Sequence, residues 1–107
     1  MKTYDEVVNK IKAFTTDRDW DQFHSPENLA KSICIEAGEL LECFQWDNNY
    51  DKEAVCEEMA DVFAYLVNLA DKLDVDLLEI ADRKMDLNAQ KYPVEKAKGK
   101  ADKYDKL

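Results

Sequence analysis

Apolar residues recur every three or four positions along most of this chain, which is the spacing of a buried face on an α-helix. Near the start the pattern is carried by Tyr4, Val7, Val8, Ile11 and Phe14. The 107 residues include only two Gly and two Pro, too few for a protein built of strands and tight turns. The sequence therefore predicts an all-α fold with one hydrophobic core, as suits a chain of this length.

Local signals for the starts and ends of helices divide the chain into four helical segments. Ser25, followed by a proline, is an N-cap hydroxyl before proline at the first helical position. Asp51 suits the same cap role, and Asp76 with Glu79 resembles a capping box. Pro93 ends the last segment. The predicted helices cover residues 3–15, 26–45, 52–73 and 77–92, and their short connections predict a four-helix bundle.

The charge is distributed unevenly along the chain. The formal net charge is −9, but residues 93–107 carry five lysines against three acids, so residues 1–92 hold −11. We expect a helical functional domain over residues 1–92 and a polar, lysine-rich tail over residues 93–107. An acidic domain argues against binding to a nucleic-acid polymer, although divalent cations allow such a protein to bind a phosphate ligand.

The cysteine content and the hydropathy of the chain indicate in which cellular compartment the protein is expected. Cys34, Cys43 and Cys56 are odd in number, lack a C-x-x-C pair, and do not suggest a zinc site. No secretory signal is recognisable in the first residues, so we expect three reduced, buried thiols in a cytoplasmic protein. The longest uncharged apolar run, residues 62–70, is too short to cross a bilayer, and no membrane association is expected.

Two pairs of carboxylates lie at the borders of predicted apolar faces. At about 100° per residue, Glu36 falls inside the apolar arc of the second helix and Glu39 just beyond its edge. On the third helix Glu58 falls between two apolar residues and Asp61 at the margin. Solvated surface is the ordinary explanation of such pairs, because glutamate is a good helix former. If the two helices pack side by side, however, four carboxylates converge, and oxygen ligands favour Mg²⁺ or Mn²⁺ over Zn²⁺. The spacing alone leaves both explanations open.

Four segments in a fixed order carry a family resemblance: "WDQFHSPENL", "EAGELLECFQW", "EEMADVFAYLV" and "KMDLNAQKYPV". Together they resemble the all-α nucleoside triphosphate pyrophosphohydrolases of the MazG-like superfamily, most of all the dCTP pyrophosphatase branch, over residues 20–94. The resemblance implies an oligomeric helical bundle, a homodimer or a homotetramer. It also implies Mg²⁺-dependent hydrolysis between the α- and β-phosphates, which gives a monophosphate and pyrophosphate.

The resemblance assigns roles to individual residues. Glu36 and Glu39 match the family's E-x-x-E, and Glu58 and Asp61 match its E-x-x-D; these are the catalytic carboxylates that bind the Mg²⁺ ions, and the ions hold the triphosphate. Either Glu36 or Glu39 would accept the proton of the attacking water. The matched substrate-binding residues are Trp20, Gln22, Phe23, His24 and Trp46 around base and sugar, Tyr65 on the third helix, and Lys84, Asn88 and Lys91 facing the phosphates. Without the resemblance, core packing explains the aromatics and a solvated face explains the lysines.

Two departures leave the base preference open. Ile35 stands where some family members carry a second glutamate, and the first helix lacks the histidine of some dCTP-specific members. A rival interpretation is a non-catalytic helical interaction module that retained the fold. A di-iron carboxylate bundle fits poorly, because such sites use Glu-x-x-His and the single histidine, His24, is far from both pairs.

Overall fold

The structure is a computed structural model, which describes residues 2–46 and 49–107. Its elements are α1 (Tyr4–Asp17), the 3₁₀ turn η1 (Asp21–Phe23), α2 (Pro26–Glu42), α3 (Lys52–Lys72), α4 (Leu77–Lys91), α5 (Val94–Ala97) and the 3₁₀ turn η2 (Tyr104–Lys106). The described ranges contain no β-strand. The predicted all-α fold class, with four main helices, is confirmed.

Side-chain caps fix the starts of these helices. The Ser25 hydroxyl accepts a hydrogen bond from the Asn28 amide at 3.1 Å, and a proline follows Ser25 at the first helical position. Asp51 caps α3 in the same way, and Asp76 accepts from the amides at the start of α4. The predicted capping box is only half formed, because the Glu79 carboxylate accepts from the Arg83 guanidinium at 3.1 Å, one turn along.

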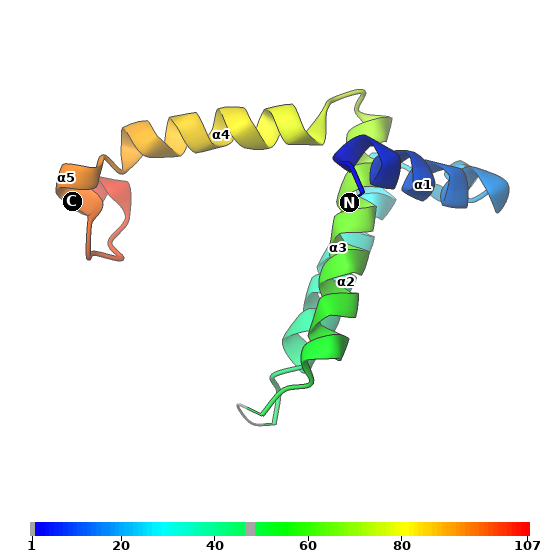
Figure 1. Cartoon of the computed structure of the whole chain (residues 1–107), viewed down its shortest axis with the longest axis horizontal. Coiled ribbons are helices and arrows are strands. Elements are labelled where there is room, and N and C mark those ends of the chain that lie inside the picture. Colours follow the sequence, from blue (N-terminus) through cyan, green and yellow to red (C-terminus); the bar gives the residue numbers. More distant parts are fainter. Residues whose placement is uncertain (1, 47–48) are drawn as a thin grey trace. The chain divides into compact units, whose positions relative to one another are not determined.

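The chain divides into two compact units, one through Val75 and one from Asp76 onward. In the first unit α2 packs antiparallel along α3, and α1 packs against α3 (Figure 1). Leu29 of α2 and Val67 of α3 are 1% and 2% exposed and form the centre of the core with Ala70. These helices place the carboxylates of α2 and α3 on facing helix surfaces.

Part of the apolar stripe along α2 and along α3 is exposed, whereas the helical spacing predicted a buried face. Leu41 on α2 is 72% exposed, Met59 on α3 is 56% exposed, and Leu73, the C-cap residue of α3, is 54% exposed. Three helices cover only the sides that they turn toward one another, so the outer edges of the stripes stay open. Two of the thiols expected to be buried, Cys34 and Cys56, are likewise exposed, although all three cysteines are free as predicted.

The second unit contains α4, α5 and η2. The Tyr104 ring packs edge-on against Tyr92 with their centroids 6.2 Å apart, and the Lys91 ammonium lies 5.1 Å from the centre of the same ring. Residues after Pro93 thus contact the end of α4, while the domain boundary at residue 92 stays a prediction. None of the helices in the described ranges combines the length and the apolarity that a membrane span requires.

Candidate metal and nucleotide site

Three of the four predicted carboxylates meet between α2 and α3. Glu36 from α2 and Glu58 and Asp61 from α3 each offer one oxygen, and these oxygens all lie within 4.8 Å of one another. Glu36 and Glu58 are half-buried and Asp61 is exposed. Glu39 is exposed and is not one of these three residues. It nevertheless lies close enough to raise the pKa of both Glu36 and Glu58. Because α2 and α3 pack side by side, acids of the two pairs come together, which is the condition that the helical spacing had left open.

Two oxygens of this cluster are buried without a hydrogen-bond donor in the described part of the chain. Glu36 Oε2 and Glu58 Oε2 are buried, and neither has a hydrogen-bond donor among residues 2–46 and 49–107. A buried carboxylate oxygen without a donor is destabilising, and a divalent cation removes that penalty. The donor set consists of carboxylate oxygens alone, which fits Mg²⁺ or Mn²⁺. The residues present therefore fit the metal that the resemblance implies.

The same crowding disturbs the acid–base equilibria. Partial burial, followed by the close approach and negative charge of Glu39 and then the charge of Asp61, raises the pKa of Glu36 from 4.5 to about 7. Burial and then Glu39 also raise the pKa of Glu58. Both shifts have the sign expected when like charges meet with little solvent. Near neutral pH a proton and a cation therefore compete for the cluster.

A cavity of about 550 Å³ adjoins these carboxylates, and α1, the segment after it, α2 and α3 all contribute to its wall. Its volume lies in the range of small-molecule sites. We call it the α1–α3 cavity, and its lining residues are Val7, Lys10, Ile11, Phe14, Thr15, Trp20, His24, Glu36, Ala60, Asp61, Phe63, Ala64, Tyr65 and Asn68. Two metal-site carboxylates, Glu36 and Asp61, thus line a mainly apolar and aromatic space.

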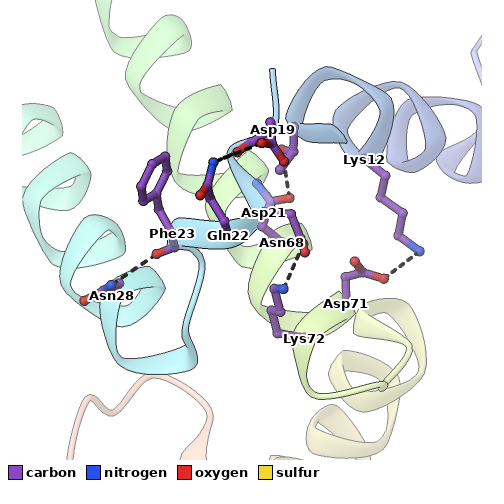
Figure 2. A network of polar contacts seen from close by, with 10 residues as sticks. Lys12, Asp19, Asp21, Gln22, Phe23, Asn28, Asn68, Asp71 and Lys72 are labelled. Atoms are coloured by element: carbon purple, nitrogen blue, oxygen red, sulfur yellow. Dashed lines mark hydrogen bonds and ion pairs between the residues drawn. The ribbon is translucent and has the colours of Figure 1, made fainter. Parts of the chain in front are cut away.

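The segment between α1 and α2 is fixed over this region by polar contacts (Figure 2). The Lys72 ammonium of α3 lies 2.8 Å from the Asp21 carboxylate. The Asn28 amide donates to the Phe23 carbonyl at 3.1 Å, which ties η1 to the first turn of α2. The Trp20 amide donates to the Thr15 carbonyl at 3.1 Å. These bonds hold Trp20 and His24 at the cavity wall.

Three of the predicted substrate-binding residues reach the cavity. Trp20, His24 and Tyr65 line it, and the rings of His24 and Tyr65 meet edge-on with centroids 6.5 Å apart. Trp20 also packs edge-on against the ring of Phe14 at 5.7 Å. Aromatic faces beside a charged cluster suit a ligand with a flat base and a phosphate chain.

The structure places the other predicted substrate residues elsewhere. The Gln22 amide donates to the backbone carbonyl and the carboxylate of Asp19, and Phe23 is 61% exposed. Trp46, at the edge of the described range, is 86% exposed. None of these three lines the α1–α3 cavity, so their contact with substrate stays a prediction.

The polar residues of α4 belong to the second unit. Lys84 and Lys91 are exposed and Asn88 is half-buried. Asn88 donates to the Met85 sulfur at 3.9 Å, within the same helix. Their predicted contact with the phosphates stays a prediction.

Sequence reasoning missed the contribution of α1 and of two polar residues. Thr15, which is 6% exposed, and Asn68 line the cavity and are hydrogen-bonded to each other. A signal for Asn68 was present, because it is the polar residue inside the otherwise apolar run of residues 62–70, and an amide there requires a partner. Thr15 gave no comparable signal.

Comparison with known proteins places the chain in a family. Residues 31–107 match the MazG-like family. The chain is 41% identical over 113 residues to dCTP pyrophosphatase 1 of Mus musculus and 38% identical over 113 residues to that of Homo sapiens. Each alignment covers 95% of this chain and 66% of the relative, so the chain spans about two thirds of the length of these proteins.

A solved structure agrees with the sequence comparison. The crystal structure of a pyrophosphatase from Archaeoglobus fulgidus superposes with a TM-score of 0.76 at 39% sequence identity, covering 87% of this chain and 94% of that one. The resemblance inferred from four ordered segments is thereby confirmed. The chain belongs to the MazG-like family.

Proposed function

We propose that this protein is a Mg²⁺-dependent nucleoside triphosphate pyrophosphohydrolase. It cleaves the bond between the α- and β-phosphates of dCTP, or of a modified dCTP-like nucleotide, and releases the monophosphate and pyrophosphate. The observation that carries the proposal is the contact of the carboxylate cluster of Glu36, Glu58 and Asp61 with an aromatic-lined cavity. Similarity to dCTP pyrophosphatase 1 of mouse and man, and to an archaeal pyrophosphatase, supports the proposal.

In the proposed site Glu36, Glu39, Glu58 and Asp61 hold the metal. Bound Mg²⁺ supplies charge neutralisation to the triphosphate and Lewis-acid activation of the attacked phosphorus and of water. The buried oxygens of Glu36 and Glu58 lack donors from the described part of the chain and are thus available as ligands. A carboxylate oxygen of Glu36 or Glu39 that the metal leaves free accepts the proton from the attacking water.

The aromatic side of the site binds the nucleoside. Trp20 and Tyr65 offer ring faces and edges in the cavity, and His24 adds a polar nitrogen beside Tyr65. Gln22, Phe23 and Trp46 complete the enclosure of base and sugar, and Lys84, Asn88 and Lys91 contact the phosphates. Stacking of a base on such rings contributes about 1–3 kcal/mol.

We further propose that the enzyme is a cytoplasmic homodimer or homotetramer. The exposed edges of the α2 and α3 stripes, which include Leu41, Met59 and Leu73, form an apolar surface of the kind that another copy buries. Burial of this surface also accounts for the small core of the first unit.

The deciding experiment measures pyrophosphate release from a panel of nucleoside triphosphates, with Mg²⁺ and with EDTA. Mg²⁺-dependent release with preference for dCTP is the expected result. The rival non-catalytic interaction module predicts no release, and no gain in thermal stability from Mg²⁺ with nucleotide, whereas a ligand of the folded enzyme raises the melting temperature.

A further inference from the structure

Thr15 and Asn68 form a polar patch in an otherwise apolar part of the α1–α3 cavity. The Thr15 hydroxyl, on α1, donates to the Asn68 Oδ1 atom, on α3, at 3.2 Å. The neighbouring lining residues, Ile11, Phe14 and Phe63, are apolar. Thr15 is 6% exposed and Asn68 is half-buried. This pair joins the two helices inside the cavity wall.

The hydrogen bond determines which part of the Asn68 amide remains available. A side-chain amide has one oxygen acceptor and two N–H donors on its nitrogen. Because the Asn68 oxygen already accepts from Thr15, the Nδ2 hydrogens are the group left for a ligand in the cavity. A half-buried donor is stabilised by an acceptor, and a ligand with a lone pair at this position would supply one.

The position of Asn68 along α3 suits contact with a nucleobase whose phosphates lie at Asp61. Asn68 follows Asp61 by seven residues, which places it on nearly the same face of the helix and about 10 Å further along the axis. Tyr65 lies between them on that face, and all three line the cavity. A nucleotide with its phosphates at Asp61 therefore extends its sugar past Tyr65 and its base toward Asn68. Asn68 is labelled on α3 in Figure 2, just before the residues that anchor α1 and η1.

We infer that Asn68 is a specificity-determining residue for the base and that Thr15 positions it. This inference rests on the proposed function. The Asn68 Nδ2 group donates to the ring nitrogen at position 3 of a pyrimidine. Cytosine presents a lone pair there, with the O2 acceptor beside it, whereas uracil and thymine present an N–H group, which would oppose a donor. With its oxygen bonded to the Thr15 hydroxyl, the amide presents its Nδ2 hydrogens to the base, so the pair selects cytosine nucleotides.

The test compares kcat/KM for dCTP and dUTP with Mg²⁺ in the full chain and in Asn68→Leu. Loss of a hydrogen bond in a site built to form it lowers kcat/KM for the matched substrate. We expect Asn68→Leu to lower the dCTP value about 10- to 100-fold and the dUTP value by less than about 3-fold. Substitution of dCTP by its 3-deaza analogue, which lacks the lone pair, should lower the rate of the unmodified protein similarly and that of Asn68→Leu little.

Two further variants keep the inference testable if Asn68→Leu folds poorly. Asn68→Asp keeps the shape but replaces the donors by an acceptor, and should shift the preference toward dUTP. Thr15→Val removes the positioning hydroxyl and should reduce the dCTP/dUTP ratio of kcat/KM, while Thr15→Ser, which keeps the hydroxyl, should preserve it. Circular dichroism and the melting temperature verify the fold of each variant.

The outcomes separate two kinds of failure. If the unmodified protein hydrolyses dCTP and the Asn68 variants keep its dCTP/dUTP ratio, the specificity role is overturned and the pyrophosphohydrolase stands. A preference of the unmodified protein for dUTP would overturn the specificity role as well. If the unmodified protein neither hydrolyses any triphosphate nor binds the non-hydrolysable α,β-methylene analogue of dCTP, the proposed function and the inference fall together.

Discussion

Glu36 on α2 and Glu58 on α3 approach each other with carboxylate oxygens within 4.8 Å, and each buries an Oε2 atom that has no donor in the described part of the chain. Two acids placed in this way repel each other and lose hydration, which destabilises the metal-free fold. Such a site is retained where a ligand compensates for the cost.

Neutralisation of one carboxylate of the cluster should lower the activity without lowering the stability of the metal-free protein. Glu36→Gln or Asp61→Asn is expected to lower Mg²⁺-dependent pyrophosphate release by at least about 100-fold, because each variant removes a metal ligand and its charge. The same substitutions should leave the metal-free melting temperature unchanged or raised, since they relieve repulsion. Steady-state kinetics and thermal denaturation in EDTA measure the two effects.

The control for these variants is Glu42→Gln, on the exposed side of α2. It removes the same charge outside the carboxylate cluster and should keep activity within about 2-fold, as for most surface substitutions. Near-normal turnover in Asp61→Asn would contradict the assignment of the metal site.

The stability of the metal-free protein should fall as pH rises. The pKa of Glu36 is about 7 in the folded protein and 4.5 as its ordinary value, so the folded state binds the proton more tightly than the unfolded state. The contribution of Glu36 to the free energy of unfolding is fully present below pH 4.5 and is lost as pH rises through about 7. The raised pKa of Glu58 changes the free energy of unfolding in the same direction. By linkage, unfolding becomes easier over this window.

Thermal denaturation in EDTA between pH 5 and 8 measures this dependence, with Glu36→Gln as the comparison. The variant should show a flatter profile, and Mg²⁺ should restore stability most at the high end of the range, because protons compete with the metal below about pH 7. A metal-free melting temperature that rises over this window would contradict the prediction.

A charge in the exposed apolar surface should disrupt the proposed oligomer. Leu41 is 72% exposed, so Leu41→Glu should leave the secondary structure of a single chain intact while it prevents a second copy from burying this position. We expect light scattering to show a smaller assembly for Leu41→Glu than for the unmodified protein. Leu41→Met, which stays apolar, should keep the larger assembly, and identical masses for all three proteins would exclude this surface from the interface.

Replacement of the glycine within α2 should stabilise the protein. A Cβ atom added at Gly38 meets no atom within 4 Å, and Gly38 lies inside the helix. Alanine restricts the unfolded chain more than glycine does, and the expected gain is about 0.5–1 kcal/mol in the free energy of unfolding. Urea denaturation of Gly38→Ala measures it, and destabilisation would show that another surface packs closely against this position.

The sequence alone determined where the helices begin and which acids lie at the borders of their apolar faces. Ser25, Asp51 and Asp76 cap the helices at the predicted positions, because capping depends on a side chain and the amides two or three residues after it. Glu36 and Glu58 fall at the border of their helices' apolar faces by helical geometry alone. The order of four short segments was also enough to identify the family.

Only the tertiary structure decided what the acids face and which residues share the cavity. Thr15 and Asn68 are 53 positions apart, and no local rule relates residues at that separation. Trp20 and His24 reach the cavity because contacts with α3 and α2 anchor their segment, while Gln22 and Phe23, between them, do not line it. Leu41 and Met59 are exposed although they lie on the apolar faces of their helices. Periodicity shows which face of a helix is apolar, but burial depends on whether another element covers that face.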